Sequence, residues 1–138
     1  MPNSKSRHAF IVEDDAHSLY ILGNLLNQLG IQFRRNTAGK DVIAQLKRSD
    51  PLPDFILMTL NLPDDGAFSI CKRIRQDPEL RELVIIGLAN TLDDDLKTKT
   101  RKHDFTAMAI KPLSLKLLPE LLDAIDRGTL TFESLLKS

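Results

Sequence analysis

Three acidic residues stand in a row directly after a short apolar run near the start of the chain. The run HAFIV covers residues 8–12, and Glu13, Asp14 and Asp15 follow it. Adjacent carboxylates at a strand end can hold a hard divalent cation such as Mg²⁺, which takes oxygen ligands and keeps several waters. They can also accept hydrogen bonds from the first free N–H groups of a following helix. We favour the cap for Asp15, and a present or ancestral metal role for Glu13 and Asp14.

Two further polar residues end apolar runs later in the chain. Lys111 follows residues 107–110 and precedes Pro112. Its ammonium group suits a phosphoryl oxygen and equally suits the carboxylates after the first run, so both interpretations stay open. Thr59 ends the run FILMT at residues 55–59. A threonine hydroxyl is a weak neutral nucleophile, because it must lose a proton to a general base as it attacks.

The elements that must position these residues follow from the spacing of the apolar positions. Strands are predicted at residues 8–12, 31–34, 55–60, 84–88 and 107–110, and helices at residues 16–29, 39–48, 68–75, 92–103 and 114–125. The helix at residues 92–103 has few apolar positions and should be loosely anchored. Alternating strands and helices predict an α/β fold with a doubly wound, five-stranded parallel sheet and five helices, (βα)5. In such sheets the functional site lies at the carboxyl ends of the strands.

Length and composition limit the classes of function. The chain has 138 residues, with 19 basic and 19 acidic side chains and a formal net charge of zero. We therefore expect one domain at residues 1–126, with residues 127–138 as a C-terminal appendage whose spacing permits a short helix. Zero net charge gives no electrostatic footprint for nucleic acid or for an anionic membrane. Without a signal peptide or membrane span, and with Cys71 as the single cysteine, a cytoplasmic protein is expected.

Three motifs in this order resemble the receiver domain of bacterial two-component response regulators, of the chemotaxis-receiver kind. They are VEDD at residues 12–15, PDFILMTLNLPDDG at residues 53–66 and IKPL at residues 110–113. The resemblance covers about residues 7–126 and implies a flavodoxin-like fold. It also implies transfer of a phosphoryl group from a sensor kinase's histidine to an aspartate at the end of the third strand, with Mg²⁺ bound beside it.

The resemblance assigns roles to four residues that match the family pattern. Glu13 and Asp14 match the acidic pair that holds Mg²⁺, and Asn61 matches the residue that supplies a backbone carbonyl ligand. Lys111 matches the lysine that pairs with the phosphoryl group. These matches leave the scaffold of the family's site in place.

Three other positions depart from the family pattern. Counting five residues on from Asp54, the phosphoacceptor position is occupied by Thr59. In the family, a hydroxyl residue that ends the fourth strand and an aromatic residue on the fifth strand change position as a switch upon phosphorylation. Here the switch hydroxyl position is Ala89, and the switch aromatic position is Met108. A receiver degenerate at these positions has no catalytic residue for phosphoryl acceptance, so the resemblance implies either no cofactor or weakly bound Mg²⁺.

The predicted function is therefore signalling by protein–protein interaction, as a stand-alone receiver-like domain of a phosphorelay that is not an enzyme. Its partner would be a histidine kinase, another two-component protein or a second copy of the chain. One alternative is a small flavodoxin-like enzyme that uses Lys111 with Glu13 and Asp14 on a phosphorylated metabolite. EDDAHS, which stands where a glycine-rich phosphate loop would be, argues against it. Another is a receiver phosphorylated on Thr59 by an unrelated kinase.

Overall fold

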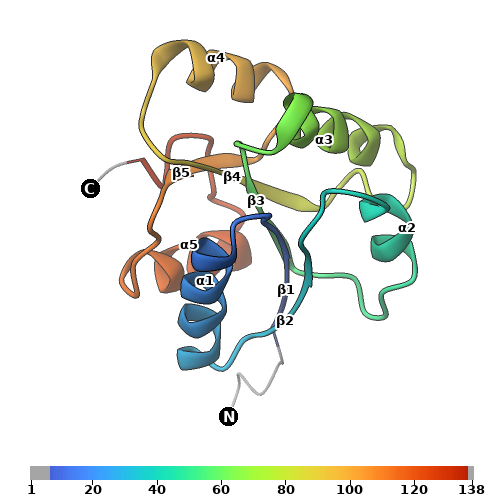
Figure 1. Ribbon diagram of the computed structural model, residues 1–138. Coiled ribbons are helices and arrows are strands. Elements are labelled where there is room, and N and C mark those ends of the chain that lie inside the picture. The colour runs from blue at the N-terminus through green and yellow to red at the C-terminus, as the bar shows by residue number, and fades with distance from the viewer. Residues whose placement is uncertain (1–6, 137–138) are drawn as a thin grey trace.

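The computed structural model describes residues 7–136 and contains a five-stranded parallel sheet (Figure 1). The strands lie in the order β2-β1-β3-β4-β5. Their bounds are β1 (His8–Val12), β2 (Gln32–Asn36), β3 (Phe55–Thr59), β4 (Val84–Ala89) and β5 (Ala107–Ile110). The helices between and after them are α1 (Ala16–Gln28), α2 (Val42–Lys47), α3 (Gly66–Gln76), α4 (Asp94–Lys102) and α5 (Leu117–Arg127), with a 3-10 turn η1 (Pro63–Asp65) before α3. The predicted doubly wound α/β fold is confirmed.

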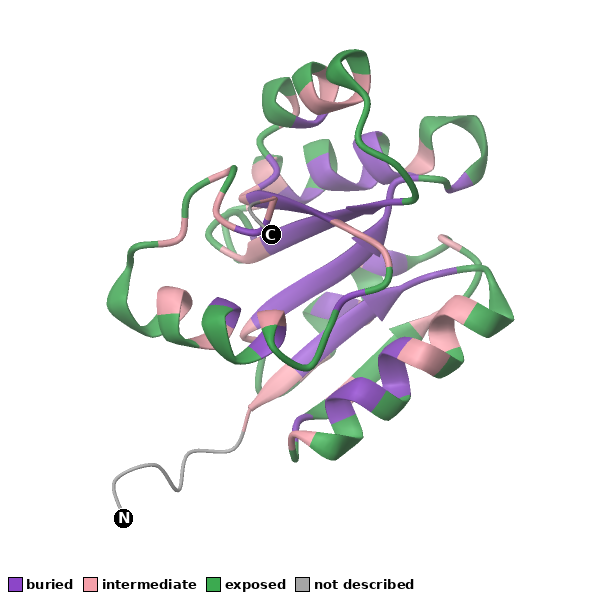
Figure 2. Ribbon diagram, turned by 90° about the vertical axis from the view of Figure 1, so that its left-hand side faces the viewer, coloured by how far each residue is buried: buried purple, intermediate pink, exposed green. Residues whose placement is uncertain are grey.

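Helices cover both faces of the sheet, and each face has its own hydrophobic core. Successive side chains of β1 alternate between the cores: Phe10 and Val12 join the side of α2, α3 and α4, while Ala9 and Ile11 join the side of α1 and α5. All five residues of β3 are buried. Figure 2 shows the central strands in purple and the helices purple only on their inner sides. A strand covered on both faces explains the nearly unbroken apolar run FILMT.

The order of the strands reverses beside β1. The chain passes from β1 to β2 on one side and then crosses to β3 on the other, so β1 has both as neighbours. The carboxyl ends of β1 and β3 therefore flank a topological switch point, which is where ligands bind in open α/β sheets.

The second strand and second helix begin later than expected. The strand predicted at residues 31–34 is β2 at Gln32–Asn36, and the helix predicted from residue 39 begins at Val42. Gly39 and Asp41 have φ values of 72° and 59°. Both residues are thus in the left-handed region, which cannot continue a right-handed helix.

Two other helices begin later than expected, and a side-chain cap sets the start of the first of them. The Asp93 carboxylate accepts hydrogen bonds from the backbone N–H groups of Asp95 and Leu96, so α4 begins at Asp94 rather than at residue 92. The hydroxyl of Ser114 accepts the N–H of Leu117, where α5 begins instead of at residue 114. Helix α5 ends at Arg127, and Gly128 follows with a φ of 67°.

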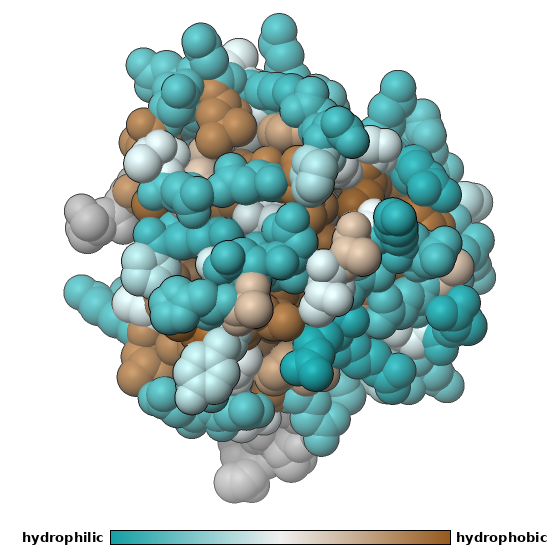
Figure 3. Space-filling view, viewed as in Figure 1, coloured by the Kyte–Doolittle hydropathy of each residue, from teal (hydrophilic) through white to brown (hydrophobic). Residues whose placement is uncertain are grey.

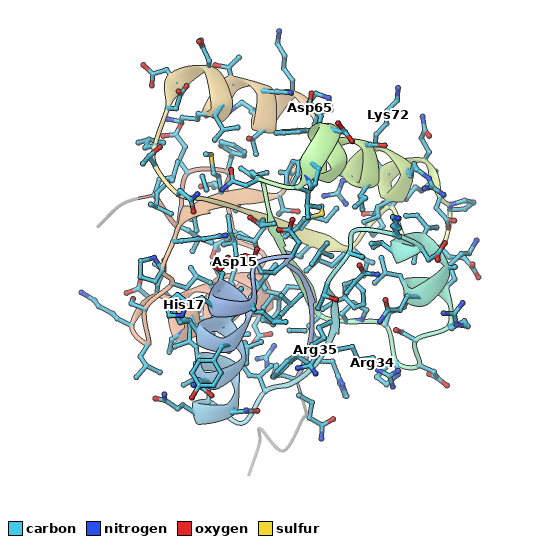
Figure 4. All side chains as sticks on the ribbon, viewed as in Figure 1. Asp15, His17, Arg34, Arg35, Asp65 and Lys72 are labelled. Carbon is cyan, nitrogen blue, oxygen red and sulfur yellow. The ribbon has the colours of Figure 1, made fainter. Side chains whose placement is uncertain are left out.

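Contacts of individual side chains fasten α4, which buries only Thr100. Lys99 forms an ion pair with Asp65 at 2.9 Å, and its ammonium nitrogen lies 4.4 Å from the centre of the Phe68 ring. The Phe68 ring also meets the His103 ring edge-on, with centroids 5.0 Å apart. Figure 4 shows Asp65 at the start of α3, close to α4. Helix α4 is thus held to α3 mainly by the long side chain of Lys99, which reaches Asp65, and by the contacts of the Phe68 ring.

Residues 129–136 pack against the sheet instead of extending away from it. The spacing permits a short helix, and the described part of the tail has hydrogen-bonded turns at residues 132–136. Leu135 is buried, and Leu130, Phe132 and Leu136 are partly buried against the two cores. These apolar residues meet different surfaces, on both sides of the sheet edge.

The thiol of Cys71 should be inert in the folded protein. Cys71 is buried on α3, its Sγ donates to the carbonyl of His103 at 3.2 Å, and burial raises the pKa of the thiol to about 12. We expect no reaction with a colorimetric disulfide reagent at about pH 8, because reaction requires the thiolate. In urea the same reagent should titrate one thiol per chain. Full labelling within minutes in native buffer would contradict this prediction.

Across residues 7–136, no helix combines the length and the apolar character that crossing a bilayer requires.

Candidate functional site

Three strands bring the predicted site residues together at the carboxyl edge of the sheet. Glu13 directly follows β1, Thr59 is the last residue of β3, and Lys111 directly follows β5. The Lys111 Nζ atom lies 2.7 Å from Glu13 Oε1 and 2.9 Å from Thr59 Oγ1. Lys111 therefore reaches across the end of β4 to join the two neighbouring strands β1 and β3.

The carboxylate and the hydroxyl of this trio are shielded from solvent, while the lysine is partly open. Glu13 and Thr59 are each 1% exposed, and the side chain of Lys111 is 15% exposed. An ammonium group has three donors and no acceptor, so Lys111 must donate to both oxygens. A buried carboxylate is costly unless it is paired and hydrogen-bonded, and Lys111 supplies that pairing for Glu13.

The second oxygen of Glu13 also has a partner. Glu13 Oε2 accepts the backbone N–H of Asp15 at 3.1 Å. The Asp15 carboxylate in turn accepts the N–H of Ser18 at 2.8 Å and caps α1 (Figure 4). This hydrogen bond from Ser18 holds the pKa of the Asp15 carboxyl below its usual range. The interpretation of Asp15 as a helix cap is thereby supported by its contacts.

Asp14 and Asn61 lie at the rim of the site. Both residues are exposed. The N–H of Asn61, in the turn after β3, lies 3.4 Å from Thr59 Oγ1. Asp14 is thus the acidic residue of the site that faces solvent, and Glu13 is the one engaged by the protein.

The donor set does not fit a Mg²⁺ ion well. Magnesium in proteins takes carboxylate, carbonyl and water oxygens in a near-octahedral arrangement. Here Glu13 gives both oxygens to hydrogen bonds within the protein, and Thr59 supplies a neutral hydroxyl. Within residues 7–136 no group of three or more His, Cys, Asp or Glu side chains is placed to hold a metal. Of the acidic pair matched to the family, Asp14 is the one that faces solvent.

The geometry gives Thr59 no general base. Its hydroxyl oxygen accepts a hydrogen bond from Lys111, which is a proton donor and not a base. Glu13, the nearby carboxylate, is committed to the ammonium of Lys111 and to the N–H of Asp15. A buried hydroxyl between these groups is suited to completing a hydrogen-bond network and poorly suited to attack on phosphorus.

The two other departing positions lie in the sheet beside the site. Ala89 ends β4, is fully buried, and its carbonyl accepts the N–H of Lys111 at 2.8 Å. Met108, in the middle of β5, is also fully buried and packs in the core on the α3 side. Neither side chain reaches the trio of Glu13, Thr59 and Lys111 through a hydrogen bond.

Sequence reasoning missed two sets of residues that lie outside this trio and hold α4. Lys99 and Phe68 fasten α4, for which the sequence predicts only a loose attachment. Glu133 lies in the tail and forms ion pairs with Lys97 and Arg101 of α4. No sequence signal pairs these residues, because their partners are distant in the chain and are brought close by the fold.

A five-stranded parallel sheet with a lysine and acidic residues at its carboxyl edge defines a receiver-type α/β domain. The model of the response regulator receiver domain family matches residues 9–123, and the chain belongs to that family.

Individual relatives agree with this assignment. The polar-differentiation response regulator DivK of Brucella ovis is 24% identical over 110 residues, which cover 80% of this chain and 88% of DivK. The crystal structure of a response regulator from Chloroflexus aurantiacus J-10-fl superposes with a TM-score of 0.78 and 26% identity, covering 88% of this chain and 98% of that one. The receiver domain of Ssk1 from Saccharomyces cerevisiae, solved with the histidine phosphotransfer protein Ypd1, has a TM-score of 0.76 at 19% identity, over 94% of each chain. That last likeness concerns the fold alone.

Proposed function

We propose that this receiver domain acts in two-component signalling by protein–protein interaction and does not accept a phosphoryl group on residue 59. The observation that carries the proposal is the double hydrogen bond of Lys111 to Glu13 and to the hydroxyl of Thr59. By the spacing of its motifs, Thr59 stands where the family has its acceptor aspartate. With a neutral hydroxyl at residue 59, Lys111 neutralises the Glu13 carboxylate and is not left unpaired for a phosphoryl group.

The side chains at the switch positions also support a receiver without a phosphorylation-driven change. Ala89 has no hydroxyl to follow a phosphoryl oxygen, and Met108 has no ring to change its rotamer in response. A ligand shifts a conformational equilibrium only through different contacts in the two states, and these two side chains offer no polar contact of that kind. The domain would therefore act through a surface that is present at all times.

The partner that fits this role is a histidine kinase or a histidine phosphotransfer protein. The complex of Ypd1 with the receiver domain of Ssk1 shows that a receiver fold of this type can bind such a partner. In the view of Figure 3 the surface is mostly hydrophilic, with hydrophobic side chains visible between the polar ones. A partner docking on this side would meet mainly polar groups, as is usual for a transient interface.

The two alternatives have less support. Phosphorylation of Thr59 by another kinase would need access to a hydroxyl that is 1% exposed and bonded to Lys111. Turnover of a phosphorylated metabolite would need a free cationic group, whereas Lys111 is engaged by Glu13.

Intact mass after incubation with acetyl phosphate and Mg²⁺ tests the proposal. The wild-type chain is expected to keep its mass, because Thr59 has neither a charge nor a base to activate it. Thr59→Asp should gain one phosphoryl group per chain, since an aspartate is an anion at neutral pH and needs no base. Thr59→Asn, of nearly the same shape as aspartate but neutral, is the matched control and should remain unmodified. A phosphoryl group mapped to Thr59 of the wild-type chain would refute the proposal.

A further inference from the structure

The tail of the chain lies along the outer edge of β5. Strand β5 is at one end of the sheet, so one side of it has no neighbouring strand. On that side the N–H of Met108 donates to the carbonyl of Phe132 at 3.2 Å. In Figure 1 the red segment after α5 returns to β5 and passes between α4 and α5. The tail thus covers a strand edge that would otherwise present unpaired backbone groups.

Apolar residues of the tail pack on both sides of this edge. Leu130 and Leu135 join the core beneath α1 and α5. Phe132 and Leu136 pack against the core beneath α3 and α4. The segment therefore wraps around the end of the sheet, and its removal would uncover apolar surface from both cores at once.

One acidic residue of the tail holds it to α4. Glu133 Oε2 lies 2.6 Å from a guanidinium nitrogen of Arg101 and 3.4 Å from the ammonium of Lys97. The Arg101 guanidinium also lies 4.9 Å from the centre of the Phe132 ring. The hydrogen bond from Arg101 lowers the pKa of the Glu133 carboxyl below its usual range. Glu133 is half-exposed, so these contacts can open without disturbing the sheet.

At its start the tail is tied to the end of α5. The N–H of Thr129 donates to the carbonyl of Ala124 at 2.9 Å, across Gly128 in its left-handed conformation. Thr131 and Ser134 then form a local turn through the N–H of Thr131 and the hydroxyl of Ser134, 2.8 Å apart. These contacts turn the chain back toward β5.

We propose that residues 129–136 form an intramolecular strap that closes the β5 edge and prevents two copies of this chain from pairing through it. An open strand edge flanked by apolar surface is self-complementary, because two such edges can pair antiparallel about a two-fold axis. The second copy is the occupant that this edge fits once the strap is released. Closure of the β5 edge by the tail does not depend on the chemistry of Thr59.

The net charge of the chain does not oppose such pairing. The whole chain has 19 basic and 19 acidic side chains. Deleting residues 129–138 removes Glu133 and Lys137, which leaves 18 of each and a formal net charge still of zero. A change in self-association after this deletion would therefore come from the uncovered edge and not from a changed net charge.

Light scattering on a chain that ends at Gly128 tests the strap. The full chain is expected to have the mass of one copy, and the shortened chain should reach twice its own monomer mass as its concentration rises. Circular dichroism on the same samples reports whether the fold is kept. A folded shortened chain that stays monomeric at every concentration would overturn the proposal, as would a full chain that already dimerises through β5.

A point variant of the full chain provides the test if the shortened chain does not fold. The Glu133→Lys variant places a positive charge beside Lys97 and Arg101, and the repulsion between these like charges should release the strap. Asp123→Lys is the matched control, because it makes the same charge change against Arg127 on α5. We expect the Met108 amide to exchange its hydrogen at least about threefold faster in Glu133→Lys than in wild type or in the control. Dimers should also appear only in Glu133→Lys; equal exchange and equal mass in both variants would refute the strap.

Discussion

Replacing Lys111 with methionine is expected to lower the free energy of unfolding by about 3 kcal/mol. The variant keeps Glu13 buried at the end of β1 and removes the ammonium group that neutralises it. Breaking a buried ion pair from one side leaves a charge without compensation, which costs more than the pair contributes when intact. Thr59 loses the hydrogen bond from Lys111 at the same time.

Urea denaturation followed by circular dichroism measures this loss. The double variant Glu13→Gln/Lys111→Met should recover more than half of it, because no buried charge then remains. Lys47→Met is the control on the surface, where Lys47 pairs with Asp77 and Glu79; its denaturation midpoint should stay close to that of wild type. If Lys111→Met alone unfolds at the wild-type urea concentration, the pairing with Glu13 has no structural role.

Thr59→Asp is expected to tighten the binding of Mg²⁺ at least about tenfold, from a wild-type affinity too weak for a resolved calorimetric signal. In the wild-type site Asp14 is the carboxylate that faces solvent, and Glu13 is held by Lys111 and the N–H of Asp15. A carboxylate at position 59 would compete for Lys111 and release an oxygen of Glu13. The ion would then meet three carboxylates, where the wild-type chain offers one.

Isothermal titration with MgCl₂ distinguishes this explanation from a general effect of substitution. Thr59→Asn changes the shape of the residue in a similar way without adding charge, and it should bind no more tightly than wild type. Adding Asp14→Asn to Thr59→Asp should weaken binding again, because a ligand at the rim is lost. Tight Mg²⁺ binding by the unaltered chain would show that Glu13 leaves Lys111 more readily than its contacts indicate.

The sequence predicts the sheet and the residues at its edge because both depend on local patterns. The run FILMT is typical of a strand covered on both faces, and alternation with amphipathic helices favours parallel strands. Once the strands are parallel, Glu13, Thr59 and Lys111 must end at one edge. Their mutual distances do not follow from the pattern, nor does the choice of Glu13 over Asp14 as the partner of Lys111.

What the sequence does not predict depends on contacts between distant segments or on single backbone angles. Asp41 in the left-handed region shortens α2, and no side-chain periodicity reveals it. The tail has the apolar spacing of a short helix, yet Leu135 and Leu136 pack into different cores, which a helix confined to one face of the sheet could not achieve. The attachment of α4 through Lys99 depends on the position of Asp65, more than 30 residues earlier in the chain.

Helix α4 differs from α1 and α5 in the kind of force that holds it, and the difference makes ionic strength a selective control. Its ion pairs with the rest of the molecule run through Lys97, Lys99 and Arg101, all of which meet carboxylates at partly exposed positions. Added salt screens such pairs over a Debye length of about 10 Å at 0.1 M and about 3 Å at 1 M. The packing of the apolar faces of α1 and α5 on the sheet is not weakened by the same screening. Raising the salt concentration therefore loosens α4 and the strap together, while α1 and α5 stay packed on the sheet.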